Sequence, residues 1–247
     1  MRAPAEPLPR RRGIFGPAIV ALVAFLILIA LGTWQLQRKA WKEGLIADIQ
    51  RRSAAVPVDL SRPETWPQLR QENDEFRRVK LRVELRSGET FAYTSGSSLR
   101  PDIKTPGYFV FAPARLPDGR VVVINRGYVG LDRQFPPVTG SVDVTGYLRW
   151  PEPPHWLFSA EDRSGNTWIL RDHRAMAARN DWGEVGPFYI DQEAPVPEAG
   201  VPRPGPIRPS LPNNHLQYAL TWYGLAAVLA AVFGFWLRGR AHGARPD

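Results

Sequence analysis

The sequence contains no cysteine and only two methionines among its 247 residues. A folded domain exposed to an oxidising compartment must therefore hold together on its packed core, without disulfides. The lack of thiolates also excludes a covalently attached c-type haem, an iron–sulfur cluster and a cysteine-based copper site. Met1 and Met176 are the two thioether donors that the sequence offers.

The signatures of common enzyme classes are also missing. The sequence has no glycine run with the Walker or dinucleotide-binding spacing and no Gly-x-Ser-x-Gly nucleophile elbow. Its four histidines do not pair at the spacing of a helical zinc motif; they are His155, His173, His215 and His242. These absences favour a protein that is not an enzyme, with a membrane-tethered hydrolase as the catalytic alternative.

Two long stretches lack charge. No Asp, Glu, Lys or Arg occurs between Arg12 and Arg38, or between Arg208 and Arg238. The apolar parts, residues 16–34 and 213–237, are each long enough to cross a bilayer core of about 30 Å. Aromatic residues typical of the membrane interface lie in both: Trp34, Tyr218, Trp222, Tyr223 and Trp236. A cleavable signal peptide is the alternative for the first stretch.

Arginines flank the outer ends of both stretches, before the first and after the second. Because short cytoplasmic flanks are rich in Lys and Arg, both termini are expected in the cytoplasm and the central region outside it. The predicted organisation is a cytoplasmic arm (1–15), a first span (16–34), an extracytoplasmic domain (35–193), a proline-rich tether (194–212), a second span (213–237) and a cytoplasmic tail (238–247).

The central domain is predicted to begin with an amphipathic helix over residues 35–55, which continues the first span. Its predicted stripe includes Trp34, Arg38, Trp41 and Lys42, at helical spacing. The helix is expected to end at Val56 and Pro57, because proline disfavours helix in the residue before it.

Short strands dominate the rest of the domain. Apolar residues alternate with charged ones from Arg78 to Leu85, as in a half-buried antiparallel strand. Further strands are predicted at 90–94, 108–112, 120–125, 141–149, 167–171 and 188–191, with turn signals between them and one helix at 172–180 capped by Asp172. The predicted fold is a β-rich or α+β domain, an antiparallel β sandwich or barrel, between two transmembrane helices.

The net charge of +8 is carried mostly by arginine. It favours acidic partners such as lipid headgroups or carboxylates, and no nucleic-acid-binding motif accompanies it. Most of the excess is expected to reflect compositional bias.

The segment that opens the second span carries the most chemistry. His215, Tyr218 and Trp222 share one helical face at the outer membrane edge. An ionisable side chain at this depth is a functional candidate, and imidazole is a natural ligand of haem iron. By spacing alone, a structural histidine is the favoured interpretation.

Six sequence blocks in order resemble those of the Surfeit locus protein one family. They are Gly32–Lys42, Gly107–Val110, Ile124–Val129, Gly146–Arg149, Asn166–Asp172 and Pro212–Ala226, and together they cover almost the whole chain. Two positions depart from the family pattern: Tyr128 stands where tryptophan is frequent, and the run from Phe111 to Arg115 replaces a Thr-Pro-Leu-like one. These departures concern local packing more than function.

The resemblance implies an assembly factor of cytochrome c oxidase, a chaperone that binds haem a and assists its insertion into, or its stabilisation in, the catalytic subunit. It implies that subunit as a partner, and haem A synthase is a further candidate. His215 would ligate or contact haem a, which could be held stably or passed on. The residues expected around it are Tyr218, Trp222, Arg38, Trp34 and Trp41. An extracytoplasmic scaffold without a cofactor is the alternative function. The short, serine-poor segment before Ile14 favours a bacterial plasma membrane over a mitochondrial one.

Overall fold

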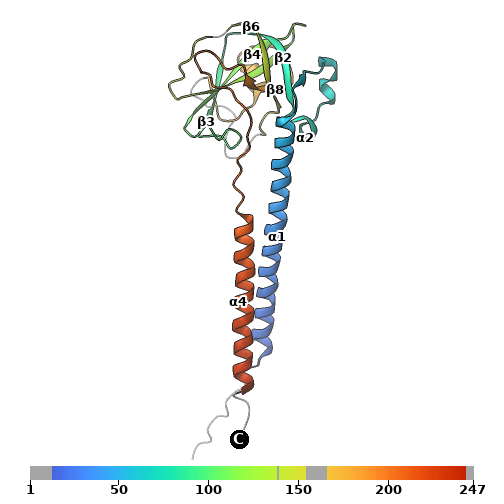
Figure 1. Cartoon of the computed structure of the whole chain (residues 1–247), viewed down its shortest axis with the longest axis vertical. Coiled ribbons are helices and arrows are strands. Elements are labelled where there is room, and N and C mark those ends of the chain that lie inside the picture. Colours follow the sequence, from blue (N-terminus) through green and yellow to red (C-terminus); the bar gives the residue numbers. More distant parts are fainter. Residues whose placement is uncertain (1–12, 138, 154–165, 243–247) are drawn as a thin grey trace, which may run out of the picture. The chain divides into compact units, whose positions relative to one another are not determined.

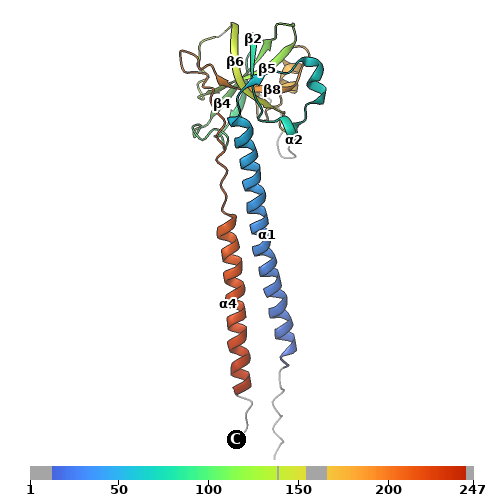
Figure 2. The same cartoon turned by 45° about the vertical axis from the view of Figure 1, so that its right-hand side comes forward.

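The computed structural model of the chain describes residues 13–137, 139–153 and 166–242, with the side chains of the last two residues left undescribed. Its contacts divide into two units (Figures 1 and 2). One contains residues 1–44 and 212–247, and the other contains residues 45–211. Most of the predicted arm, the end of the predicted tail and His155 lie outside the described residues.

The first unit is an antiparallel pair of helices, formed by α4 (His215–His242) and the N-terminal part of α1 (Phe15–Ala54). By length and composition, both helices can cross a membrane. The less exposed positions recur every three or four residues on both, which is the spacing of a left-handed helix–helix seam. The positions with this spacing are Ala18, Ala21, Phe25, Leu28, Gly32, Gln35, Lys39 and Lys42 on α1, and His215, Ala219, Trp222, Ala226, Leu229, Phe233 and Trp236 on α4. Ala24, Ile29 and Leu31 on α1 and Tyr223 and Leu237 on α4 are also less exposed.

Outside this seam the helices expose large apolar side chains. Phe15, Leu220 and Phe235 are among the most exposed. Water would oppose such a surface, whereas lipid tails accept it. The predicted stripe of Trp34, Arg38 and Trp41 also lies outside the seam.

The second unit is built around a small β-barrel. Its strands are β1 (Val58–Asp59), β2 (Arg78–Leu85), β3 (Thr90–Thr94), β4 (Gly107–Arg115), β5 (Val121–Val129), β6 (Gly140–Arg149), β7 (Thr167–Trp168) and β8 (Val185–Ala194). They form one sheet in the order β1-β2-β6-β8-β5-β4-β3-β7, and a further pairing of β2 with β4 closes the ring β2-β6-β8-β5-β4. Of the two predicted architectures, the barrel is the one found.

Side chains alternate between the two faces of each strand, and the apolar ones on the inner face fill the barrel. On β2, Val79, Leu81, Val83 and Leu85 are buried while their neighbours are exposed or half-buried. These four residues belong to one apolar cluster with Leu116, which follows β4, and with inward residues of the other ring strands: Ala114, Val122, Ile124, Val144, Leu148, Phe188 and Ile190. Such a cluster is the packed interior of a barrel too narrow for a channel.

Two smaller cores lie on the outside of the ring. One packs Met176 of α3 (His173–Arg179) and Trp168 against Phe109, Phe111 and Tyr189 of the sheet. The other packs Ile49, near the end of α1, against Tyr147 and Ile207. The barrel is therefore covered by α3 on one face and by the end of α1 on another.

The strand directions are more varied than the predicted antiparallel pattern. Most pairs are antiparallel, but β5 pairs with β8, β1 with β2 and β3 with β7 in parallel. Alternation of apolar and polar residues reports that a strand is half-buried and does not report its direction. The chain between β5 and β8 contains β6, β7 and α3, which gives it the length that a parallel connection requires.

Most predicted elements are confirmed, with shifted ends. The strand at 90–94 has the predicted bounds, whereas β4, β5 and β8 extend beyond theirs and β7 is shorter. Asp172 caps α3, because its Oδ1 accepts from the backbone N–H groups of Arg174 (3.0 Å) and Ala175 (3.1 Å). The sequence did not predict β1, the 3₁₀ helix Pro63–Gln68 or the short α2 (Gln71–Asp74).

Backbone hydrogen bonds fix the proline-rich segment 194–212 to the barrel over part of its length. Arg203 exchanges hydrogen bonds with Tyr128 of β5, and Arg208 and Ser210 donate to the carbonyls of Leu99 and Ser98. The segment therefore follows the barrel surface instead of forming a free polyproline-like tether.

His173 is fully buried behind β8. Its Nε2 lies 3.0 Å from the carbonyl oxygen of Gly186, and its Nδ1 has no partner among the described residues. Burial, which disfavours the imidazolium, lowers the pKa of His173 to about 4. The folded domain therefore holds a neutral histidine.

Acid is expected to destabilise the domain through this histidine. The unfolded chain takes up the proton below about pH 6.5 and the folded chain only near pH 4, so stability is lost as the pH falls through that window, by up to about 3 kcal/mol. Urea unfolding of wild type and His173→Gln, compared between about pH 7 and pH 4.5, measures this. Equal pH dependence in the two proteins would show that His173 does not contribute.

Candidate functional site

His215 begins α4 and faces α1. Its Nδ1 lies 2.7 Å from Oε1 of Gln35. An amide oxygen can only accept, so Nδ1 carries the proton, and in the neutral ring Nε2 keeps its lone pair. Metal-binding histidines commonly have this arrangement, in which the second ring nitrogen donates to a fixed acceptor. His215 thus presents a nitrogen that is chemically suited to a metal.

Further contacts fix the two helices on either side of this pair. Toward the barrel end of α1, Lys42 Nζ donates to the carbonyl oxygen of Pro212. In the other direction, Thr33 Oγ1 and Tyr223 Oη lie 3.0 Å apart. The Tyr223 ring packs on Gly32, where an added Cβ would lie 2.7 Å from a ring carbon. Gly32 therefore permits the close approach of the helices at this level.

The predicted residues of α1 lie on one flank of this helix pair. Residues of an α-helix advance by about 100° each, which places Arg38 about 60° around α1 from Gln35, and Trp34 and Trp41 about 100° to 120° around it in the same sense. The guanidinium of Arg38 stacks on the Trp41 ring at 3.9 Å. Trp34 and Trp41 are each 54% exposed.

Tyr218 of α4 lies on the same flank. Tyr218 lies about 60° around α4 from His215, in the same direction of rotation as Arg38 lies around α1 from Gln35. Because the two helices are antiparallel and face each other at Gln35 and His215, these equal rotations bring Arg38 and Tyr218 to the same side of the pair. Gly32 and Tyr223 are both turned the other way and do touch, as this geometry requires. We call the surface formed by Trp34, Arg38, Trp41 and Tyr218 the Arg38 flank.

Trp222 occupies a different position from the other predicted residues. It lies two helical turns beyond His215 and is half-buried in the seam. The structure thus brings His215 and Trp222 into the seam, and places the Arg38 flank beside it. No recorded hydrogen bond or ring contact joins His215 to a member of the flank within the described residues.

Gln35 is the site residue that the sequence analysis missed. A polar side chain just after an apolar span, one residue from Trp34, could have been noted as a candidate. Its pairing with His215 spans 180 residues, however, and depends on the register of the two helices.

The barrel carries a second polar cluster, on the outside of the ring. Arg149 donates from Nε to Glu75 (3.2 Å) and from Nη1 to Asp191 (3.3 Å), and Asn125 Nδ2 donates to Asp191 at 2.8 Å. Burial alone would lower the pKa of Arg149, but Tyr189 and the two carboxylates beside it raise it. The cluster connects β5, β6 and β8, so its evident role is to hold the strands together.

Within the described residues, no other histidine forms a competing site. His173 is buried in the domain, and the structure does not describe His155 or the side chain of His242. In the part of the chain that the structure describes, no group of three or more His, Asp or Glu side chains could hold a metal ion. A metal bound at His215 would therefore need most of its ligands from a prosthetic group.

Two candidate membrane helices flank a small β-barrel along the chain, and a histidine that faces the first helix begins the second. This arrangement defines the class of the protein as a β-barrel domain between two apolar helices. Comparisons with known proteins cover the barrel domain, most of α1 and the first part of α4. The profile of the SURF1 family matches residues 22–227. The chain belongs to the SURF1 family.

Individual relatives support the same assignment. The chain is similar to Surfeit locus protein 1 of Rattus norvegicus (32% identity over 214 residues, 80% of this chain and 68% of the relative). It is also similar to Surfeit locus protein 1 of Homo sapiens (31% over 239 residues, 89% and 77%). A SURF1-like protein of Drosophila melanogaster is 32% identical over 236 residues, 85% of this chain and 75% of the relative.

Replacing Gly32 by valine is expected to separate the helices at the level of Tyr223. The chain has no cysteine, so Gln35→Cys and His215→Cys introduce the only two thiols. A short bifunctional thiol reagent should link them, and the link should survive proteolysis of the central region. Adding Gly32→Val should lower the yield several-fold, because the new side chain meets the Tyr223 ring.

Gly224→Val is the matched control, since a Cβ there meets nothing within 4 Å. Equal yields from the Gly32 and Gly224 variants would contradict the packing described.

Proposed function

We propose that this protein is an assembly factor of cytochrome c oxidase that binds haem a at the outer end of its helix pair. Membership of the SURF1 family supports the role in assembly, as the six sequence blocks imply. The observation that carries the haem proposal is the hydrogen bond between His215 Nδ1 and Gln35, because it orients the ring and uses Nδ1, which leaves Nε2 as the nitrogen that can bind a metal.

The surroundings of His215 suit a large, flat, mostly apolar cofactor with carboxylate edges. The Trp34 and Trp222 rings offer apolar walls, and the Tyr218 hydroxyl can hydrogen-bond to a formyl or hydroxyl group. Arg38 can pair with a propionate through two parallel hydrogen bonds. Trp41, beneath the guanidinium of Arg38, holds that guanidinium at the membrane edge.

The cofactor would supply the redox-active iron, and the residues of the chain would bind and orient it. Gln35 holds the imidazole in one tautomer and one ring orientation, and Gly32 allows the two helices to approach closely beside it. A site open on the Arg38 flank lets a bound group leave sideways, which suits delivery to a partner. The partner we propose is the catalytic subunit of the oxidase, and haem A synthase is the proposed source.

The alternatives lack comparable support. A hydrolase needs an activated nucleophile, and the described residues show no serine or threonine paired with a histidine at the helix pair or in the barrel. A scaffold without a cofactor would not need a polar histidine–glutamine pair in the seam of two apolar helices, where each polar group must be satisfied.

Purification from cells that make haem A tests the proposal. The wild-type chain should carry a Soret band, and His215→Ala should lose most of it at matched protein yield. Gln35→Leu should keep a weaker, shifted band, because the ligand remains but its orientation is no longer fixed; loss of such second contacts typically costs about 10- to 100-fold in affinity. Arg38→Gln should lower haem content without shifting the band.

Gln37→Leu is the control for Gln35→Leu, since Gln37 lies on the exposed side of the same helix. A Soret band of wild-type position and intensity in His215→Ala would remove His215 from the site. A colourless wild-type protein would favour the scaffold.

For the orientation, we propose a bacterial plasma membrane with both termini cytoplasmic and the barrel outside, on the arginine flanks. Fused after residue 247, a reporter that works only in the cytoplasm should be active, and one that works only outside it should be inactive. Inserted at Gly140, at the exposed start of β6, the two reporters should give the opposite result. The opposite pattern would place the haem site at the wrong membrane face for this proposal.

A further inference from the structure

The barrel has a polar mouth at one end. Inward positions along β5 are Val122, Ile124 and then Arg126, and along β8 they are Phe188, Ile190 and then Gln192. The apolar rows that fill the interior therefore end in a guanidinium and an amide. Both side chains are more than nine-tenths buried, with 3% of Arg126 and 5% of Gln192 exposed.

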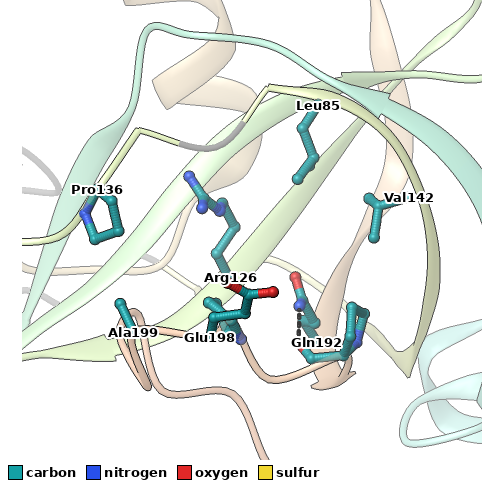
Figure 3. A pocket seen from close by; sticks show the side chains of 9 residues that line it. Leu85, Arg126, Pro136, Val142, Gln192, Glu198 and Ala199 are labelled. Carbon is teal, nitrogen blue, oxygen red and sulfur yellow. Dashed lines mark hydrogen bonds between the residues drawn. The ribbon is translucent and has the colours of Figure 1, made fainter.

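These two side chains line a cavity of about 410 Å³ that is half open to the outside (Figure 3). The volume is in the range of ligand pockets, and barrel mouths are frequent places for them. Its walls are mainly apolar: Leu85, Pro136, Val142, Pro195, Pro197 and Ala199. In Figure 3 the Arg126 side chain extends toward the side where Pro136 and Leu85 lie, and Glu198 is near Gln192.

Arg126 retains unused donors. Its Nη1 donates to Glu89 Oε1 at 3.1 Å, and within the described residues this is its one hydrogen bond. Nε and Nη2 remain, and an ionised guanidinium forms its strongest pairs with two parallel bonds to a carboxylate. Burial lowers the pKa of Arg126 more than the charge of Glu89 raises it, so the cation is under-compensated where it lies.

Gln192 retains an unused acceptor. Its Nε2 donates to the carbonyl oxygen of Pro195 at 2.7 Å, which fixes the direction of the amide, since a rotated amide would place two oxygens together. Its Oε1 is buried and has no partner within the described residues. A buried acceptor without a donor is costly, so a ligand that supplies an N–H would be favoured.

We propose that the barrel mouth binds the C-terminal end of a polypeptide chain with apolar last residues. A chain end combines the three features that the mouth calls for: a carboxylate for Arg126, a backbone N–H for Gln192 Oε1 and apolar side chains for the Leu85 and Val142 walls. A fatty acid has the carboxylate but no N–H donor, and an inorganic anion has no apolar body. The open side of the cavity lets the rest of the peptide leave.

This inference is independent of the proposed haem function, because it concerns residues 85–199 only and can be tested in haem-free protein. The probe is a fluorescein-labelled peptide, Gly-Gly-Ala-Val-Leu, with a free carboxylate. Fluorescence anisotropy is measured with the full chain in lipid nanodiscs, and empty nanodiscs give the background. The same peptide with a C-terminal carboxamide should bind at least about 10-fold more weakly.

Two variants test the residues without removing Arg126. Glu89→Gln removes the negative charge that competes for Arg126 and keeps an oxygen that can accept from Nη1, so it should strengthen binding of the free-acid peptide about 3-fold or more. Val142→Trp should abolish binding by filling the cavity. Arg82→Gln is the control, since Arg82 is exposed on the outer side of β2, and it should bind as wild type does.

A structural role for Arg126 alone predicts no peptide binding and no effect of Glu89→Gln. Equal binding of the acid and amide peptides would also overturn the proposal. Octanoate tests the alternative that the mouth binds fatty acids. If octanoate binds, Val142→Trp abolishes that binding and the peptide does not bind, the mouth is a fatty-acid site and the proposal of a chain end is refuted. If Val142→Trp lowers the melting temperature, its loss of binding is not informative. The ratio of the affinities for the acid and amide peptides and the effect of Glu89→Gln on binding then test the proposal.

Discussion

The pairing between the end of β2 and the end of β4 is the contact on which the central domain depends. Glu84 and Leu85 pair there with Arg115 and Ala114, and the sheet thereby becomes a ring of five strands. Closure gives the sheet an inside, which side chains fill, and an outside, which α3 and the end of α1 cover. It also creates two open ends, one of which is the mouth with Arg126 and Gln192.

The helix pair follows a different constraint, because in a membrane each polar group must find a partner within the protein. Apolar side chains face outward, and the polar ones, Gln35, Lys42 and His215, are satisfied in or beside the seam. This inverts the pattern of a water-soluble amphipathic helix. It explains why the tryptophans of α1 are exposed although they are the most apolar residues of their stripe.

Much of the fold follows from local sequence. The spans, the alternation of β2 and the cap at Asp172 depend on residues close together in the chain, and each was predicted. The strand predicted at 120–125 ends too early, at a point where Asn125 and Gly127 are residue types typical of turns. In the structure Arg126 pairs with Glu89, and Gly127, at φ 116°, admits the backbone of Arg203, so β5 continues to Val129. Those partners are distant in sequence and could not be read from it.

The candidate site shows the same division. His215, Tyr218 and Arg38 could be named from spacing and from the family resemblance, but Gln35 depends on which turn of α1 faces α4. The same holds for the mouth, where Arg126 and Gln192 belong to strands that pair only after the chain has passed through β6, β7 and α3.

Ring closure also determines what the sheet leaves uncovered. The terminal strands of the described sheet, β1 and β7, have two residues each, so few unpaired backbone groups remain for another chain to join. Anchored proteins share a two-dimensional layer in which their effective concentration is high. With such short sheet edges, the domain offers neighbouring copies few backbone groups for strand addition in that layer.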